Sequence, residues 1–343
     1  MRAVVLASLF CFLGAVAACS ATGGNHFTAA TATGAGGAGA TGAGTGGTSL
    51  TGGFTVTTGV SVGGGGPGCS AAAKLVYVLS TSNDIYPFEP DKKMFGSSFS
   101  LNCTTPMNDG LTWAPNSMAV DRDAVAWVNY VGTGTDPVTL MASDQGGLVF
   151  KVDINKQSCA PSPTITLTDP SWYRLGMGFS TDTVGGTSET LYVTGTGTNG
   201  MANSPGLGKI DMATKTVVPI HAFSGKLVGQ SAELTGTGDG KLYGFFTTTP
   251  VYVAEIDKVS GATPSPVPMN GVATPIAWAF SFWGGDFYLY TNSAADQMMF
   301  PKVTTTVTKY HPGGSVDTSY MHDIGFTIVG AGVSTCAPIT PPN

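Results

Sequence analysis

The chain has 343 residues, of which 49 are glycine, and only 10% are charged, against roughly 25% in ordinary soluble proteins. Its formal net charge is −6, and its few Lys and Arg residues are scattered along the sequence. Nucleic acids and anionic lipid headgroups are both bound by clustered cations, so the composition argues against either as a partner.

The first eighteen residues have the features of a secretory signal peptide. A short basic segment at 1–2 is followed by an apolar run at 3–16, which is too short to span a bilayer comfortably. The run ends in the sequence VAAC at 16–19. Small residues before a cysteine resemble the lipobox of bacterial lipoproteins, with Val where Leu is commonest. The resemblance implies that residues 1–18 are removed and that Cys19 carries the lipid. An ordinary secretory signal with a coincidental cysteine is the alternative.

The residue after Cys19 bears on where such a lipoprotein would reside. Lipoproteins retained at the inner membrane usually have Asp at this position, whereas this chain has Ser20. The resemblance therefore implies an exported protein anchored to the outer membrane or the cell surface. Several acyl chains on one cysteine give stable anchoring.

Residues 19–68 are predicted to form the lipidated cysteine and a disordered tether. The segment 20–68 contains no Asp, Glu, Lys or Arg and is nearly all Gly, Thr, Ala and Ser. A segment of this kind cannot bury enough apolar surface to offset the entropy lost on ordering. The folded domain is therefore expected at 69–343.

From Lys74 onward, short alternating strands are separated by Gly, Asp, Asn and Pro, which predicts an all-β domain. One pattern recurs five times, namely an apolar residue, a polar or acidic residue and a turn. We interpret each copy as the end of the third strand of a β-propeller blade. The copies lie at 88–91, 152–155, 210–213, 256–259 and 310–313.

Two further strands precede most of these turns. Aromatic-bearing strands, predicted to be second in each blade, lie at 75–78, 126–128, 191–193, 242–246 and 287–290. Strands suited to a crowded central channel, predicted to be innermost, lie at 118–120, 176–179, 232–235 and 278–280.

The first blade lacks an innermost strand, and the segment 328–333 near the C-terminus supplies one. Pairing of 328–333 with 75–78 would close the ring and remove open sheet edges. The prediction is a propeller of five four-stranded blades, with six possible if the tail or the long loops add strands. A β-sandwich or an irregular barrel is the alternative architecture.

Two stretches, AELTGTGDGKLYGFF (232–246) and WAFSFWGGDFYLYT (278–291), resemble a family of secreted bacterial propeller lipoproteins. The resemblance covers most of 74–338. It implies the fold and export but no activity.

Four cysteines lie in the predicted domain, and an even number in an exported chain suggests two disulfides with three possible connectivities. Cys336 follows the closing strand and Cys69 precedes its neighbour. The ends of an antiparallel pair lie on one face, so topology favours Cys69–Cys336. Cys103–Cys159 follows by elimination.

The sequence contains no constellation that names a reaction. It lacks a P-loop lysine, Cys-x-x-Cys and His-x-x-x-His, and the predicted domain at 69–343 lacks Gly-x-Ser-x-Gly, so no catalytic residue, metal ligand or cofactor is predicted. Five aspartates recur between first and second strands, where Asp is typical of hairpin turns. They are Asp121, Asp123, Asp182, Asp239 and Asp286.

Glu233 is the acidic residue that differs, because it lies within a predicted innermost strand. A carboxyl in the channel must be solvated, paired or functional, and we expect Arg174 as an ion-pair partner. The alternative is that Glu233 contacts a ligand. Glycoside hydrolysis would need a second carboxyl nearby, and none is evident.

Aromatic residues near the blade connections give the strongest argument for binding, because Trp and Tyr stack on sugars and anchor protein partners. The alternative is packing between blades. The predicted function is a non-enzymatic binding or scaffold module, acting as a monomer on a glycan or protein through its loop-rich face. A polysaccharide hydrolase or lyase using a channel carboxylate is the second hypothesis. The candidate ligand-binding residues are Trp113, Trp172, Tyr173, Arg174, Glu233 and Trp278.

Overall fold

The computed structural model describes residues 69–197, 203–299 and 301–341. The predicted signal peptide 1–18, Cys19 and the tether 19–68 lie outside the described residues. Within those three ranges, no helix has the length and apolar character needed to cross a membrane.

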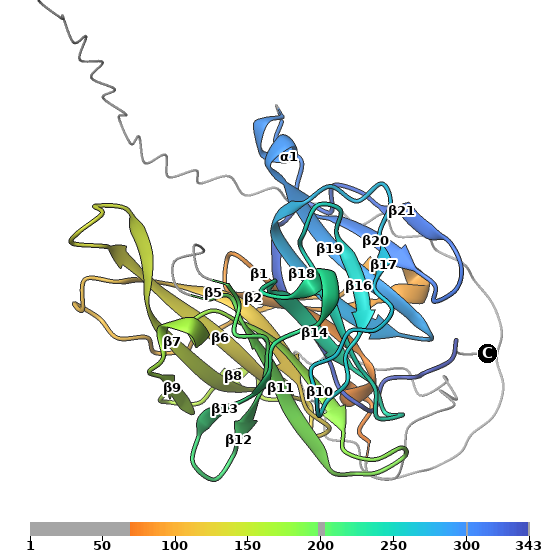
Figure 1. The fold of residues 1–343 in the computed structure, drawn as a ribbon, viewed down its shortest axis with the longest axis horizontal. Coiled ribbons are helices and arrows are strands. Elements are labelled where there is room, and N and C mark those ends of the chain that lie inside the picture. Colours follow the sequence, from red (N-terminus) through yellow and green to blue (C-terminus); the bar gives the residue numbers. More distant parts are fainter. Residues whose placement is uncertain (1–68, 198–202, 300, 342–343) are drawn as a thin grey trace, which may run out of the picture. The chain divides into compact units, whose positions relative to one another are not determined.

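The domain is built from five antiparallel sheets, each with four strands in succession from the inside outward (Figure 1). Blade 1 comprises β22 (Ile328–Val333), β1 (Val76–Ser80), β2 (Asp84–Glu89) and β3 (Met94–Phe95), and a short extra strand, β4 (Phe99–Ser100), also pairs with β2. Blade 2 comprises β5 (Thr112–Val120), β6 (Val125–Thr135), β7 (Ala142–Asp153) and β8 (Ser158–Cys159), and β9 (Ile165–Leu167) also pairs with β7.

The remaining blades follow in chain order. Blade 3 comprises β10 (Leu175–Thr181), β11 (Glu189–Gly195), β12 (Leu207–Asp211) and β13 (Thr216–His221). Blade 4 comprises β14 (Ala232–Gly236), β15 (Leu242–Phe246), β16 (Tyr252–Glu255) and β17 (Val267–Pro268). Blade 5 comprises β18 (Pro275–Trp283), β19 (Asp286–Ser293), β20 (Thr306–Tyr310) and β21 (Val316–Met321). Among the described residues, the helical segments are one short α-helix, α1 (Ala294–Met298), and 3₁₀ turns at Ala72–Lys74, Pro90–Lys92, Pro170–Trp172 and Gly225–Leu227.

The ring is closed by the two ends of the domain. β22 lies antiparallel to β1, with Val333 opposite Val76 and Gly330 opposite Leu79. The predictions of a five-bladed propeller and of its closure are therefore confirmed. Because β1 and β22 pair with each other, the facing edges of both strands are hydrogen-bonded. This pairing removes a site for edge-to-edge association with another chain.

The innermost strands carry glycine because their backbones approach one another closely. A Cβ atom added to Gly176 on β10 would lie 1.9 Å from the carbonyl oxygen of Ala232 on β14. A Cβ atom on Gly236 would lie 2.0 Å from the carbonyl oxygen of Phe179. These distances are far inside van der Waals contact, so a side chain at either position would push two blades apart.

The hydrophobic core lies between neighbouring blades. Trp127 of blade 2 meets Phe179 of blade 3 edge to face, with 6.1 Å between ring centroids. Phe88 of blade 1 meets Tyr290 of blade 5 in the same manner, at 6.0 Å. Alternation along each strand sends one set of side chains to each neighbour, so both faces of a blade are buried.

Both predicted disulfides are present. Cys69 is bonded to Cys336, and Cys103 is bonded to Cys159. The first bond joins the start of the described chain to the segment that follows β22, and the second ties the connection between blades 1 and 2 to β8. Disulfides persist in oxidising compartments, so the two bonds indicate an extracytoplasmic domain.

Candidate functional site

A cavity of about 370 Å³ lies at the end of the propeller axis where the innermost strands begin. Each of the five blades contributes residues through its innermost strand or the segment just before it, so the cavity sits over the central channel. A volume of this size is at the lower end of the range for small-molecule sites. The lining residues are Pro115, Asn116, Arg174, Leu175, Gly176, Thr196, Ser231, Ala232, Glu233, Ile276, Ala277, Trp278 and Val329.

The opposite end of the channel is covered by the segment that follows β22. Thr335 and Ala337 in this segment are only 3% and 4% exposed. The Thr335 hydroxyl donates to Glu189 of blade 3 at 2.8 Å, and the Pro338 carbonyl accepts from Gly284 of blade 5 at 2.8 Å. The segment therefore crosses beneath the ring, and the cavity opens at one end of the channel only.

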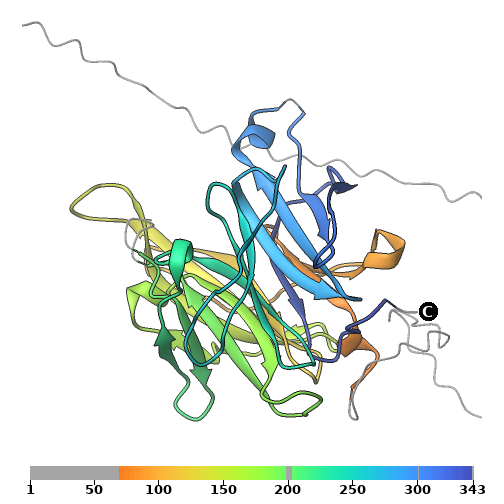
Figure 2. The same ribbon diagram turned by 45° about the vertical axis from the view of Figure 1, so that its right-hand side comes forward.

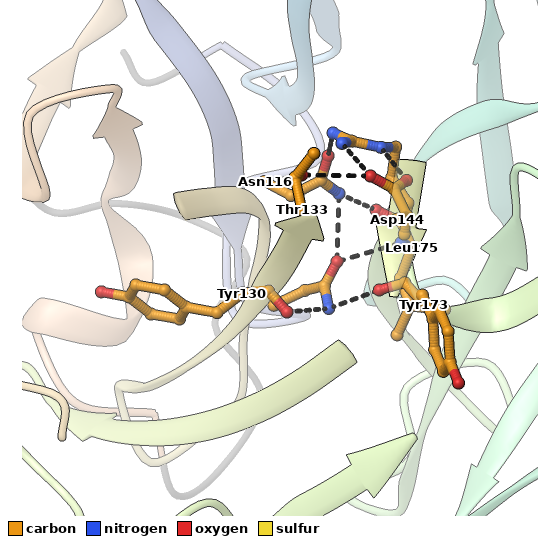
Figure 3. Close-up of polar contacts among 8 residues, drawn as sticks. Asn116, Tyr130, Thr133, Asp144, Tyr173 and Leu175 are labelled. Carbon is orange, nitrogen blue, oxygen red and sulfur yellow. Dashed lines mark hydrogen bonds and ion pairs between the residues drawn. The ribbon is translucent and has the colours of Figure 1, made fainter. Parts of the chain in front are cut away.

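Arg174 stands at the rim of the cavity, immediately before β10. It is held by Asn116 and Asp144 of blade 2, both of which are labelled in Figure 3. Its Nε and Nη2 atoms each donate to the carboxylate of Asp144 at 3.0 Å, and Nη1 donates to Asn116 Oδ1 at 2.6 Å. Two parallel bonds between a guanidinium and a carboxylate fix orientation as well as charge. Arg174 is thus neutralised and rigid, with its remaining N–H groups free to meet a ligand.

Asn129, which is fully buried on β6, supports this arrangement from below. Its Oδ1 atom accepts from Asn116 Nδ2 at 3.1 Å and from the Leu175 amide at 3.0 Å. Its Nδ2 atom donates to the Tyr173 carbonyl of the next blade at 3.2 Å. The amide therefore satisfies backbone groups of both blades and fixes Asn116 and Arg174 at the cavity.

Glu233 on β14 lines the cavity and is 3% exposed. Its Oε1 atom accepts from the hydroxyl of Ser117 on β5 and from the amide of Met177 on β10, the latter at 3.4 Å. Burial raises the pKa of Glu233 well above its usual range, and the two hydrogen bonds oppose this only in part. Burial therefore favours the neutral form of the carboxyl group.

The expected ion pair between Arg174 and Glu233 is wrong. The Arg174 guanidinium is paired with Asp144 instead, and Glu233 is held by uncharged donors. The physical reason is register. Arg174 lies just outside the first residue of β10, at the rim, whereas Glu233 is the second residue of β14 and points across the channel toward β5.

The structure brings together three of the six candidate ligand-binding residues. Arg174, Glu233 and the half-buried Trp278 line the cavity. The other three lie outside it. Trp172 is 3% exposed and packs in the core between blades 2 and 3, with Tyr173 beside it. Packing between blades was the alternative to ligand binding for these aromatic residues. Trp113 covers Gly132 and Gly146 of the long β6–β7 hairpin and donates through Nε1 to Asp109 at 2.9 Å.

Turn chemistry accounts for Asp121, the best defined of the recurring aspartates. Its Oδ1 atom accepts from the amides of Asp123 and Val125, and its Oδ2 atom accepts from Trp127 Nε1 at 3.0 Å. Asp286 instead pairs with Lys309 at 2.7 Å. In the parts of the chain that the structure describes, no group of three or more His, Cys, Asp or Glu side chains is placed to hold a metal ion.

No protein-family model matches this chain, and no curated protein matches it. A protein of unknown function from Bacteroides caccae is 11% identical, with 75% of this chain and 97% of that chain covered and a TM-score of 0.37. A protein of unknown function from Dyadobacter fermentans is 10% identical over 74% of this chain and 85% of that chain, with a TM-score of 0.43. The propeller of Dos1 is 10% identical over 78% and 72%, with a TM-score of 0.32. Likenesses at this level carry no argument about function, which has to come from the site itself.

Proposed function

We propose that this chain is an exported lipoprotein, anchored through Cys19, whose propeller binds a glycan in the cavity without chemically altering it. The observation that carries the proposal is the cavity itself. It is open at one end, and it combines the aromatic ring of Trp278 with the oriented polar groups of Arg174 and Asn116. Aromatic faces together with a few fixed hydrogen-bonding groups are what sugar recognition requires.

The position of Cys69 supports presentation of this site away from an anchoring membrane. Cys69 is bonded to Cys336, which lies in the segment beneath the ring. The chain that leads from the lipid therefore reaches the propeller at the end opposite the cavity. Figure 2 shows the yellow β6–β7 hairpin at the upper left and the blue helix α1 at the top, with the orange start of the described chain at the lower right.

The second hypothesis, a polysaccharide hydrolase or lyase, has less support. Glycoside hydrolysis by the usual route needs two carboxyl groups on either side of the scissile bond. Of the described residues that line the cavity, Glu233 alone carries a carboxyl group, and Asp144 is occupied by Arg174. A single carboxyl group among the described lining residues supports recognition rather than turnover.

The proposal is tested by screening the purified full chain on a glycan array and measuring affinities of the hits by calorimetry. Ile276 lines the cavity and is 55% exposed, so Ile276→Arg should block the cavity without disturbing the core. Ile339→Arg is the matched control, because Ile339 is 39% exposed in the segment beneath the ring.

We expect Ile276→Arg to lose at least tenfold in affinity and Ile339→Arg to bind as the wild type does. Trp278→Ala should weaken binding similarly, because it removes the stacking surface. Equal binding by all variants would overturn the cavity as the site. Release of reducing sugar by the wild type would favour the hydrolase hypothesis. Binding to a protein partner, with no binding to any glycan, would overturn the glycan as the proposed ligand.

A further inference from the structure

The two oxygens of the Glu233 carboxyl group have different surroundings. Oε1 receives both protein donors, the Ser117 hydroxyl and the Met177 amide. Oε2 takes no hydrogen bond from any residue that the structure describes. It is not enclosed by protein either, since the one buried side-chain polar atom without a partner in the described ranges is Thr235 Oγ1. Oε2 is therefore the polar atom that Glu233 presents to the cavity it lines.

This asymmetry fixes where a proton would sit. An oxygen that accepts from two donors has its lone pairs engaged, so a proton on the carboxyl group belongs on the other oxygen. Protonated Oε2 is then a hydroxyl donor at the base of the cavity. The raised pKa of Glu233 is consistent with this form, because burial penalises the charged carboxylate.

The charges around Glu233 favour the same form. Among the lining residues contributed by β5, β14, β18 and β22, Glu233 is the only titratable side chain. Arg174, before β10, is the one cation of the lining, and Asp144 neutralises it through two bonds of 3.0 Å. No unpaired cation among the described lining residues therefore faces the carboxyl, and the ionised state is favoured only by the Ser117 hydroxyl and the Met177 amide.

We infer that Glu233 is a ligand-binding residue that acts as a neutral acid, donating from Oε2 to an uncharged oxygen of the ligand, so that the cavity selects neutral saccharides over amino sugars. The inference rests on the proposed function for its ligand. A cationic amine would require an ionised Glu233, which the apolar and neutralised surroundings disfavour. A hydroxyl, ring or carbonyl oxygen needs only the donor that is already there.

The state of Glu233 can be measured without any ligand. Infrared difference spectra between the full-length wild type and Glu233→Gln at pH 7 should contain the C=O band of a protonated carboxyl group, present in the wild type only. A difference that contains carboxylate bands alone would overturn the inference, whatever the protein binds.

Binding gives the second test, with a matched pair of probes. N,N′-diacetylchitobiose is neutral, and its deacetylated form, chitobiose, is a cationic diamine of the same backbone. The inference predicts tighter binding of the neutral probe and weaker binding as rising pH ionises Glu233. Tighter binding of the diamine would overturn it.

Two substitutions distinguish whether Glu233 acts on the ligand as a neutral hydrogen-bond donor or as an anion. Gln keeps an acceptor for Ser117 and Met177 and a donor toward the cavity, so Glu233→Gln should restore most of the affinity and abolish the pH dependence. Glu233→Met keeps the length but no donor, and should lose about tenfold. Loss of binding in the Gln variant to the same extent as in the Met variant would contradict a neutral donor. If no glycan on the array binds while the infrared band is present, the proposed function fails and the protonated acid stands.

Discussion

Glu233, on the innermost strand of blade 4, accepts a hydrogen bond from the hydroxyl of Ser117, on the innermost strand of blade 2. The two blades are not neighbours, so the side chain spans the central channel. The same oxygen also accepts from the Met177 amide of blade 3. One carboxyl group thus links three blades, and it forms the base of the cavity above it.

The disulfide between Cys69 and Cys336 should matter more for stability than the one between Cys103 and Cys159. The bonded cysteines are 267 residues apart in the first case and 56 in the second. On the chain-entropy model, a disulfide that closes a longer loop removes more conformational freedom from the unfolded chain. Closing a very long loop stabilises the folded domain by about 4–5 kcal/mol. Replacing Cys69 and Cys336 together by Ser should therefore lower the free energy of unfolding by about 1 kcal/mol more than the same change at Cys103 and Cys159.

Denaturant titration of the two double variants in parallel checks this expectation. Equal losses, or a larger loss for the shorter loop, would contradict it.

The sequence was sufficient to predict the blade pattern because a propeller repeats one unit. Five copies of the same strand end, together with a spare strand at 328–333, leave few ways to close the sheets. The pairing of Cys69 with Cys336 followed from that closure. The segment that covers the channel was not predicted, because Thr335 and Pro338 resemble an ordinary loop until their contacts with blades 3 and 5 are seen.

Asn129 is expected to be the polar residue whose loss weakens the contact between blades 2 and 3 most. Truncation to Ala leaves the Leu175 amide and the Tyr173 carbonyl without their partner, and each buried group left unsatisfied costs about 1–3 kcal/mol. Asn129→Ala should therefore destabilise the domain by about 3 kcal/mol or more. Asn155→Ala, in an exposed turn, is the control and should stay within about 0.5 kcal/mol. Similar thermal unfolding of both variants would refute the role of Asn129.

Glu189 should make the free energy of unfolding of the domain depend on pH. It lies at the covered end of the channel, where burial raises its pKa from an ordinary value near 4.5 to about 7. Between these two values the folded state binds more protons than the unfolded state, so the free energy of unfolding falls as pH rises from 4.5 to 7. Glu189→Gln removes this contribution, and its stability relative to the wild type should rise across the window by roughly 1–3 kcal/mol.

Denaturation of the wild type and Glu189→Gln at several pH values measures this difference directly. Glu255→Gln, at an exposed carboxyl group with 53% side-chain exposure, is the control for removal of a charge. A difference between wild type and Glu189→Gln that does not change with pH would contradict the raised pKa.

The site was harder to predict than the fold, for a physical reason. Composition and spacing show which residue types occur at blade connections, but not which side of a strand faces the axis. Glu233 was identified because a carboxyl group stood in an apolar strand. Asn129 carried the same signal, a polar residue within the apolar run 125–131, and was missed. The partnership of Arg174 with Asp144 depends on β7 of blade 2 lying beside the segment that precedes β10 of blade 3, which no local pattern shows.

The position of a bound ligand is the most direct test of the proposed binding cavity. A crystal structure of the full chain with the tightest-binding saccharide from the array should place a sugar ring against Trp278, with one of its oxygens within hydrogen-bond distance of Glu233 Oε2. A saccharide bound instead on the outer strands of the blades, with the cavity at the channel end unchanged, would contradict it.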